Sequence, residues 1–342
     1  MKILVTGATG FLGSVLVPRL IRSFGADSVA AYVLPGDRPP VTWREEPVEI
    51  VLGDIADEDR MARACRGRSH VIHLAGLISY WRRDYGRLMK VNRGGVRAVV
   101  RACLSAPVER LVHISSVGAV GFKKRGELID EGTPFNWPPV FHYMWSKYLG
   151  QRVVENAAGA RGLPAVILNP ASIMGPGDHD PRTPHNSVYE GVYRGNLFGS
   201  LAGGLGVVDV RDVAAIAEKA LTGGRTGERY LLVGANLAYA EVLRLIARHS
   251  GRPVCPFRVP GMLLTGAGVA LETASLLTRR RPLLTRSYGA LSGWTTFYDN
   301  SKSRRDFNHS YVPIDLTIRD SCRYFERNHL RLPPGGSDGP GD

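Results

Sequence analysis

Short apolar runs alternate with longer amphipathic stretches through the first half of the chain. Each run is rich in Val, Ile and Leu and has the length of a strand buried on both faces, whereas each stretch repeats its apolar positions with helical spacing. Strands are predicted at residues 2–6, 28–33, 48–51, 69–74, 110–115 and 164–169, and helices at 11–23, 57–66, 85–104 and 142–159. This alternation predicts an α/β fold with a doubly wound parallel sheet covered by helices on both faces.

The pattern loosens after Pro170. Residues 171–206 are rich in Gly, Pro and aromatic side chains, which is typical of a loop or lid over a pocket rather than of a core element. Regular patterning returns with a predicted helix at 211–220 and a predicted strand at 229–233. A smaller C-terminal substrate domain is therefore expected to be interleaved with the first domain. The predicted division is a first domain of residues 1–175 with contributions from about 205–235, a substrate-binding or lid region of 176–330, and a tail of 331–342 that is disordered by composition.

A glycine-rich turn joins the first predicted strand to the first predicted helix. Gly7, Gly10 and Gly13 follow the strand at a spacing of three residues, in the string Thr6-Gly-Ala-Thr-Gly-Phe-Leu-Gly13. A strand that turns sharply into a helix directs free N–H groups and the positive end of the helix dipole at one point, where an anion binds. Glycine allows unusual φ angles there and lets a phosphate approach the backbone. The turn predicts a Rossmann dinucleotide site formed by Gly7, Thr9, Gly10, Phe11, Leu12 and Gly13.

A tyrosine and a lysine stand one helical turn apart in the string Tyr143-Met-Trp-Ser-Lys147. Such a pair occurs by chance on many helices. Here, however, a predicted strand ends upstream at Ser115-Ser116, and doubly wound sheets bind ligands beyond the carboxyl ends of their strands. A nearby ammonium favours the phenolate and so lowers the pKa of a tyrosine, while a serine hydroxyl can orient a substrate oxygen. Ser116, Tyr143 and Lys147 are therefore predicted as a catalytic set.

These motifs resemble those of the extended short-chain dehydrogenase/reductases of the NAD(P)-dependent epimerase/dehydratase type. Within that group the chain is most similar to the branch of dihydroflavonol-4-reductase and 3β-hydroxysteroid dehydrogenase. The resemblance runs from Met1 to about Phe325, and its motifs occur in order. It implies that Lys147 also holds the nicotinamide ribose, and that Ser116 rather than Ser115 is the catalytic serine.

The same resemblance implies further contacts with the cofactor. Gly53-Asp54-Ile55 matches the segment whose aspartate faces adenine, and His73-Leu-Ala-Gly76 matches the segment that lines the cofactor after the fourth strand. Val91-Asn92 resembles the helix with a structural and ribose-side asparagine, and Leu168-Asn-Pro170 resembles the start of the stretch that closes over the nicotinamide. The additional cofactor-binding residues are thus Asp54, Ile55, Leu74, Ala75, Gly76, Asn92 and Pro170, together with Tyr143 and Lys147.

The chain departs from the family where the choice between NAD and NADP is made. The acid that clamps the ribose of NAD should end the second strand, but that position is Val33. The next position, often arginine in NADP-using relatives, is Leu34. Asp37 and Arg38 follow on the turn and would act in opposite directions. With no acid at the expected place and Arg38 close by, the expected cofactor is NAD(P) with a slight preference for NADP.

Composition limits the other functions. The net charge of +13 comes from 44 Lys and Arg against 31 Asp and Glu, and most of the basic residues are arginine. A basic protein can bind nucleic acid, but no basic stripe interleaved with aromatic residues occurs, so no nucleic-acid partner is predicted. The four cysteines are widely spaced, which predicts free buried thiols, and the nine histidines lack paired-ligand spacing, which predicts no metal site.

Targeting signals are sparse. The N-terminus enters the first predicted strand at once, so a cytoplasmic protein without a signal peptide is expected. The apolar stretch 260–277 precedes three arginines and could lie on a membrane surface, but glycines and Glu272 interrupt it. A helix beside the substrate pocket is the preferred interpretation, so membrane association is not expected. A homodimer is left open.

Three functions remain in competition. The first is an oxidoreductase that transfers a hydride between a nicotinamide and a hydroxyl or carbonyl carbon of a largely apolar small molecule, with Tyr143 as acid or base. The second is a nucleotide-sugar epimerase or dehydratase with bound NAD, for which Arg182, Arg194 and Arg211 could hold a pyrophosphate. The third is a non-catalytic dinucleotide-binding protein, which the tyrosine and lysine argue against. Aromatic density favours the first. The candidates for the pocket are Leu77 to Trp81, Phe141, His142, Ser172, His179, Tyr189 and Tyr193.

Overall fold

A seven-stranded parallel sheet forms the centre of the molecule. The computed structural model describes residues 1–40, 43, 48–124, 126–180, 183–197, 199–254 and 257–330. The strands follow the order β10-β6-β5-β4-β1-β2-β3, and each neighbouring pair runs in the same direction. They are β1 (Ile3–Thr6), β2 (Val29–Val33), β3 (Glu49–Leu52), β4 (His70–His73), β5 (Arg110–Ile114), β6 (Ala165–Pro170) and β10 (Arg229–Leu232).

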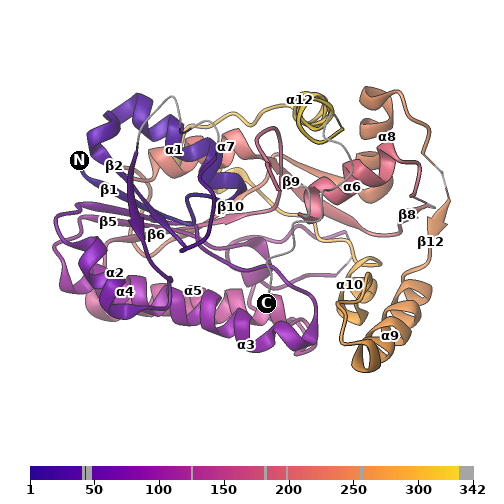
Figure 1. The fold of residues 1–342 in the computed structure, drawn as a ribbon, viewed down its shortest axis with the longest axis horizontal. Coiled ribbons are helices and arrows are strands. Elements are labelled where there is room, and N and C mark those ends of the chain that lie inside the picture. The colour runs from indigo at the N-terminus through magenta and orange to yellow at the C-terminus, as the bar shows by residue number, and fades with distance from the viewer. Residues whose placement is uncertain are drawn as a thin grey trace.

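Helices cover both faces of this sheet (Figure 1). On one face α1 lies against α7, and on the other α4 lies between α2 and α5. A π-helical segment joins the short α3 to α4. These elements are α1 (Phe11–Phe24), α2 (Glu58–Cys65), α3 (Tyr85–Leu88), the π-helical segment (Met89–Gly95), α4 (Val96–Ser105), α5 (His142–Arg161) and α7 (Val210–Lys219).

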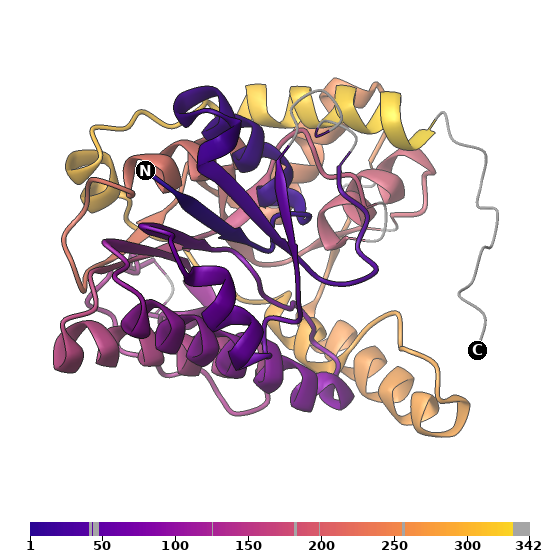
Figure 2. The same ribbon diagram turned by 60° about the vertical axis from the view of Figure 1, so that its left-hand side comes forward.

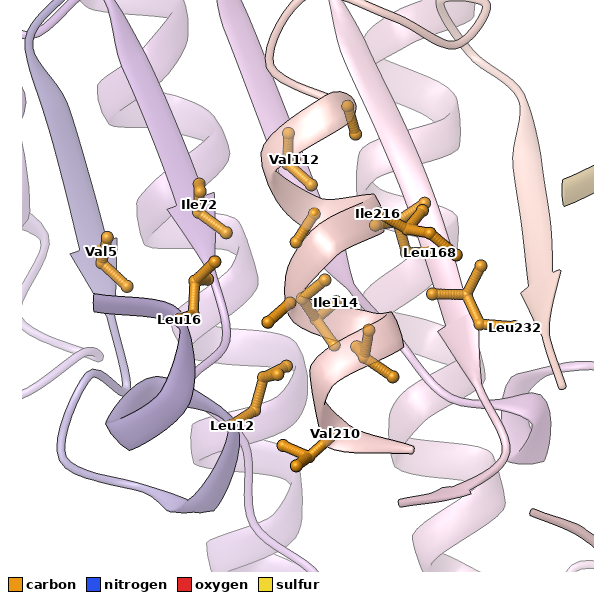
Figure 3. Close-up of a cluster of buried hydrophobic side chains, with 14 of the residues drawn as sticks. Val5, Leu12, Leu16, Ile72, Val112, Ile114, Leu168, Val210, Ile216 and Leu232 are labelled. Carbon is orange, nitrogen blue, oxygen red and sulfur yellow. The ribbon is translucent and has the colours of Figure 1, made fainter. Parts of the chain in front are cut away.

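Buried apolar side chains hold α1 and α7 on the sheet, as Figure 3 shows. Leu12 and Leu16 of α1 and Val210 and Ile216 of α7 point at apolar side chains of five strands. The sheet residues labelled in that view are Val5, Ile72, Val112, Ile114, Leu168 and Leu232. Since burial of apolar surface is the main favourable contribution to folding, this layer fixes where α1 begins and where the turn before it lies.

The order of the strands reverses between β1 and β4. The chain leads from β1 outward to β2 and β3, and then returns to β4 on the other side of β1. In open α/β sheets, ligands bind outside the carboxyl ends of the strands at such a switch point. The glycine turn follows β1 and the segment 74–76 follows β4, so the topology brings both to this place.

The residues beyond β6 form a smaller unit that is interleaved with the main sheet. A three-stranded sheet of order β11-β9-β7 and a two-stranded sheet of β12 and β8 belong to it, whereas α7 and β10 return to the main sheet. The predicted fold class, a doubly wound parallel sheet with a smaller interleaved C-terminal domain, is confirmed. The helix α11 (Ser301–Asp306) packs on β10 of the main sheet. The elements of the unit are β7 (Ser172–Met174), α6 (Pro184–Tyr193), β8 (Ser200–Leu201), β9 (Gly204–Asp209), β11 (Ala235–Ala238), α8 (Tyr239–Ser250), β12 (Arg258–Val259), α9 (Gly261–Thr278), α10 (Arg286–Leu291) and α12 (Ile314–Phe325).

The prediction of a loop or lid without core elements at residues 171–206 is wrong. This segment contains β7, α6 and β8, and α6 buries Tyr189 and Val192 in a core that it shares with α8 and α12. The helix begins at a cap that composition alone does not reveal. The hydroxyl of Thr183 accepts a hydrogen bond from the backbone N–H of Asn186 at 3.1 Å, and a proline follows in the first turn.

Some residues named in the predictions lie outside the part of the chain that the structure describes. The tail of residues 331–342, Arg182 and Cys255 lie outside the described residues. Within them, Cys65, Cys103 and Cys322 are buried free thiols, as the sequence predicts. The domain bounds stay a prediction.

Candidate active site

The glycine turn and the segment after β4 approach each other without room for a side chain. Gly7 has a φ of +67°, and a Cβ there would lie 2.6 Å from the backbone nitrogen of Ala75. Gly13 lies in the first turn of α1, where a Cβ would be 2.2 Å from the carbonyl oxygen of Ala8. Both positions therefore require glycine. Gly10 precedes the helix and offers no side-chain cap, so the first N–H groups of α1 are left for an anion, which fits the pyrophosphate of a dinucleotide.

The other residues of the turn have distinct contacts. The hydroxyl of Thr9 donates to the Asp37 carboxylate at 2.8 Å. The ring of Phe11 stacks on His185, with the two ring centroids 5.2 Å apart. Leu12 packs into the core, so that only its backbone is available to a ligand.

The segment after β4 brings further predicted residues together. Leu74 and Ala75 are partly exposed and Gly76 is exposed, and a Cβ on Gly76 would lie 3.5 Å from the Lys147 ammonium. The same Cβ would lie 3.4 Å from the side-chain oxygen of Asn92. Asn92 is itself buried and links this segment to α5. Its side chain accepts from the Leu77 N–H at 2.8 Å, donates to the Leu77 carbonyl at 2.9 Å, and donates to Ser146 at 2.8 Å.

Asp54, Ile55 and Pro170 lie at the carboxyl ends of β3 and β6. A backbone N–H two residues on and the Lys90 ammonium, 2.8 Å away, hold the pKa of the Asp54 carboxyl below its usual range. Ile55 packs on Gly95 of the π-helical segment, where a Cβ would come within 2.9 Å of it. Pro170 is buried as the last residue of β6. All three thus lie at the edge of the sheet that carries the glycine turn.

Ser116, Tyr143 and Lys147 lie together beyond the end of β5. Tyr143 and Lys147 are on α5 and both are buried. The Ser116 hydroxyl accepts from the N–H of Gly118 at 3.1 Å. A Cβ on Gly118 would lie 3.4 Å from that hydroxyl and 3.6 Å from the ring of Tyr143, so the two side chains are neighbours. The Lys147 ammonium donates to the carbonyl of Ile114 at 3.2 Å. The structure therefore brings the three predicted catalytic residues to one place.

The two serines after β5 have different partners. The hydroxyl of Ser115 is buried and donates to the Gln151 side chain of α5 at 2.7 Å. The Asn169 amide of β6 donates to the same oxygen of Gln151 at 2.7 Å and to the carbonyl of Ser116 at 2.6 Å. These bonds anchor the backbone of Ser116 from two sides, while its hydroxyl faces Tyr143.

Burial controls the protonation of the site. It raises the pKa of Tyr143 above 10, and the hydrogen bond with Ser116 opposes this. The sequence predicts that Lys147 lowers the pKa of the tyrosine, whereas in the structure burial, the largest influence, raises it. Burial also lowers the pKa of Lys147 to about 8. At pH 7 Tyr143 is therefore a neutral phenol and Lys147 is still mainly an ammonium.

Two histidines pair across β4 and β5 near Lys147. His73 and His113 are in register, and their rings stack with centroids 5.2 Å apart. His73 shares a 2.7 Å hydrogen bond with the Thr6 hydroxyl. Burial lowers the pKa of His73 to about 3 and that of His113 well below its usual value. In the part of the chain that the structure describes, no cluster of three or more His, Cys, Asp or Glu side chains could hold a metal ion.

Aromatic rings extend the site from Tyr143 toward α10. The ring of Tyr80 lies 5.8 Å from that of Tyr143 and 5.5 Å from that of Tyr288, measured between centroids. Phe141 packs beside them, with its centroid 5.7 Å from the ring of Trp294. Tyr80 and Phe141 are predicted from sequence. Tyr288 and Trp294 are missed, because they lie far along the chain and no local motif marks them.

Other predicted pocket residues lie elsewhere. Tyr189 and Tyr193 pack with Phe325 of α12 in the core of the smaller unit. The ring of His142 lies against Tyr85 of α3, with centroids 4.8 Å apart. Tyr189 and Tyr193 are therefore core residues of the smaller unit and do not line the site around Tyr143.

The fold and the glycine turn define a doubly wound protein that binds a dinucleotide at its switch point. Comparison with known proteins gives the family: residues 3–233 match the NAD dependent epimerase/dehydratase family, and the chain belongs to it. It is thus an NAD-dependent enzyme of the oxidoreductase, epimerase or dehydratase type.

Three relatives resemble the chain over nearly its whole length. It is 31% identical over 335 residues to a putative dihydroflavonol 4-reductase of Synechocystis sp., covering 95% of this chain and 94% of the relative. It is 30% identical over 332 residues to sterol demethylase protein B of Methylococcus capsulatus, covering 96% and 100%. The crystal structure of gox2253 superposes with a TM-score of 0.83 at 29% identity, covering 96% and 98%.

Replacing Gly13 with Ala should weaken dinucleotide binding by at least about tenfold, because the new Cβ forces α1 away from the turn. Fluorescence titration with NADH and NADPH measures this. Gly86→Ala is the matched control, since a Cβ on that exposed α3 residue meets nothing within 4 Å. Equal affinities of the two variants would contradict the assigned role of the turn.

Acid should destabilise the protein through the paired histidines. Between pH 6.5 and 3 the unfolded chain protonates His73 and His113 while the folded chain does not, so the free energy of unfolding falls as the pH falls. The slope contributed is up to about 1.4 kcal/mol per pH unit for each imidazole. Urea unfolding at pH 7, 6 and 5 gives the free energy of unfolding at each pH. This free energy should depend less steeply on pH in His113→Phe than in the wild type. Identical slopes would mean that His113 is protonated in the folded state.

Proposed function

We propose that the protein is an NAD(P)-dependent oxidoreductase that interconverts a hydroxyl and a carbonyl group on a largely apolar small molecule. The observation that supports this most directly is that the buried Tyr143 lies beside the Ser116 hydroxyl, with the buried Lys147 one turn further along α5. These groups lie at the carboxyl edge of the sheet, where the glycine turn fits a dinucleotide.

Each residue of the set has a part in the proton transfer. Ser116 is held by its backbone bond to Asn169 and by the Gly118 N–H, so its hydroxyl is positioned to bind the substrate oxygen. Tyr143 is a neutral phenol at pH 7 and is suited to donate a proton to that oxygen. Lys147 supplies a positive charge near the segment after β4, where it can hold a ribose. The bound dinucleotide supplies or accepts the hydride.

At neutral pH the protonation state of Tyr143 should favour carbonyl reduction over alcohol oxidation. Because the pKa of Tyr143 is raised, the phenol keeps its proton through neutral pH. Oxidation of an alcohol needs the phenolate as base, so its rate should rise as the pH rises. Lys147 loses its proton near pH 8, so any step that needs its ammonium should slow above that pH.

An apolar substrate is favoured by the side chains around Tyr143. Tyr80, Tyr288 and the neighbouring tryptophans supply aromatic surface on that side of the site. The names of two relatives, a dihydroflavonol reductase and a sterol demethylase protein, also refer to compounds of this kind.

A nucleotide-sugar epimerase or dehydratase is the second candidate, since the family name covers both. Such an enzyme would need free basic groups for a pyrophosphate. Arg211 instead binds Asp209 at 2.7 Å and Asp320 at 2.8 Å, and Arg194 binds Glu190 at 2.9 Å. The third candidate, Arg182, lies outside the described residues. The pairing of Arg194 and Arg211 weighs against this function.

Tyr143→Phe should lower turnover of an apolar ketone or alcohol by at least about 10²-fold, while dinucleotide affinity changes less than about twofold. The change removes only the hydroxyl that transfers the proton. Nicotinamide absorbance follows turnover, and titration of the same preparation follows binding. Tyr85→Phe, on the exposed α3, is the control and should keep full activity.

Two results would count against this function. Full activity in Tyr143→Phe would remove the tyrosine from the mechanism. NAD that stays with the purified protein through gel filtration, with no net turnover of alcohols or ketones, would favour an epimerase or dehydratase.

We propose further that NAD is the preferred cofactor, although the position of Arg38 alone favours NADP. The carboxylate of Asp37 is bonded to Thr9 of the glycine turn, and this places a negative charge beside the turn, where a ribose 2′-phosphate would be repelled. Arg38 is exposed on the same loop.

Asp37→Asn should shift the ratio of NAD to NADP affinity at least about tenfold toward NADP, since asparagine keeps an acceptor for Thr9 without the charge. Arg38→Ala is the comparison and should leave NAD affinity unchanged. If the wild type prefers NADP and Arg38→Ala loses that preference, the arginine decides the cofactor instead. Titrations with the four reduced and oxidised dinucleotides give these ratios.

A further inference from the structure

The helix α9 and the turn after it expose an apolar surface. Among the described residues, α9 is the one helix long and apolar enough, by length and composition, to cross a membrane, yet only 11% of it is buried. Leu277 is 89% exposed, Met262 is 88% exposed and Leu283 in the turn is fully exposed. The other large apolar side chains exposed here are Leu263, Val269, Leu271 and Leu276. So much apolar surface in one place marks an interaction site. Residues 261–291 are called the α9–α10 hairpin below.

The two arms of the hairpin lie in backbone contact. A Cβ on Gly268 would be 2.6 Å from the carbonyl of Thr285, and a Cβ on Gly289 would be 2.4 Å from that of Leu264. The glycines thus serve the contact between α9 and the returning chain, and the other sides of α9 stay open. Figures 1 and 2 both place the hairpin at the margin of the molecule, with α9 outside α10.

Arginines border the apolar surface where α9 ends. Arg279, Arg280 and Arg281 are exposed, and Arg281 also reaches back to the Ser79 hydroxyl at 3.1 Å. The one acidic residue of the hairpin is Glu272. Glu272 is partly buried, and it lies close enough to His142 of α5 to oppose the lowering of that imidazole's pKa by burial.

The charges favour one occupant over another. Apolar side chains bordered by arginines suit the interface of an anionic bilayer, where the side chains enter the acyl region and the guanidinium groups meet lipid phosphates. In a twofold dimer across this surface the arginines of one copy would meet either the arginines or the N-terminal part of α9 of the other copy. Neither arrangement gives them an acidic partner, since the one acid of the hairpin is the partly buried Glu272. The bonds that tie the hairpin to the body, from Arg281 to Ser79 and from Ser287 to the carbonyl of Val140, favour a helix lying on the bilayer over one crossing it.

We propose that the α9–α10 hairpin docks the protein on the surface of an anionic phospholipid bilayer, with Leu276, Leu277 and Leu283 inserted below the headgroups. This differs from the expectation from sequence, in which glycines and Glu272 argue against a membrane contact. In the structure Gly268 of that stretch packs against Thr285 at the start of α10, and Glu272 is partly buried. The docking does not depend on the reaction proposed for Tyr143.

Vesicle flotation of the whole protein tests the docking. Binding should be at least about tenfold stronger to vesicles with about 30% phosphatidylglycerol than to pure phosphatidylcholine, and it should weaken as salt is raised from about 0.1 to 0.5 M. The variant L276S/L277S/L283S should lose most of the binding, and R279Q/R280Q should lose the preference for anionic vesicles.

Matched variants distinguish binding through the hairpin from nonspecific binding of any exposed apolar or basic residues. I50S/L52S/L128S changes three apolar residues outside the hairpin that are each about as exposed as Leu276, and R63Q/R66Q removes two exposed arginines of the α2 region. Both should bind vesicles as the wild type does. Thermal unfolding and dinucleotide titration check that every variant is folded.

Three results would overturn the docking. The first is a wild type that floats with neither vesicle. The second is equal losses of binding in the hairpin and matched variants. The third is a dimer by light scattering that only the hairpin variants dissociate, which would show that a second copy covers the surface.

Discussion

The contact between the glycine turn and the segment after β4 determines the geometry of the rest of the site. No side chain fits at Gly7, because the backbone of Ala75 occupies the space of a Cβ. Asn92 then links the segment after β4 to α5, because its side chain is hydrogen-bonded both to Leu77 and to Ser146. Tyr143 and Lys147 lie on α5, so one series of short contacts leads from the N-terminal turn to the phenol.

A buried network of hydrogen bonds supports the backbone and side chains around Tyr143. Gln151 collects hydrogen bonds from Ser115 and Asn169, and Asn169 also holds the backbone of Ser116. Among these groups the Oδ1 of Asn169 is buried without a hydrogen-bond partner. Burial raises the pKa of Tyr143 and lowers that of Lys147. This keeps the Tyr143 phenol protonated at neutral pH, as the proposed role of proton donor requires. The charge of a bound dinucleotide is the main influence still to be added.

The parts of the structure that depend on local pattern could be predicted from the sequence. The strands, the turn at Gly7 and the Tyr143–Lys147 spacing depend on neighbouring residues, and the structure brings the catalytic set together as expected. The helix α6 was missed because its start depends on a single cap at Thr183. Tyr288 was missed because only tertiary packing brings α10 to Tyr80. The lowered pKa of Lys147 could not be predicted from the sequence, because it depends on how deeply the folded protein buries the side chain.

The position of α7 and β10 in the main sheet has a consequence for the order of folding. The apolar face of α1 is covered by α7, and β6 gains its outer neighbour only in β10, yet both elements follow a long excursion into the smaller unit. A nascent chain that has emerged only as far as β6 leaves Leu12 and Leu16 without the helix that shields them. The half that carries the glycine turn therefore cannot complete its core before residue 232 has been synthesised, and until then this apolar surface stays exposed, which favours aggregation.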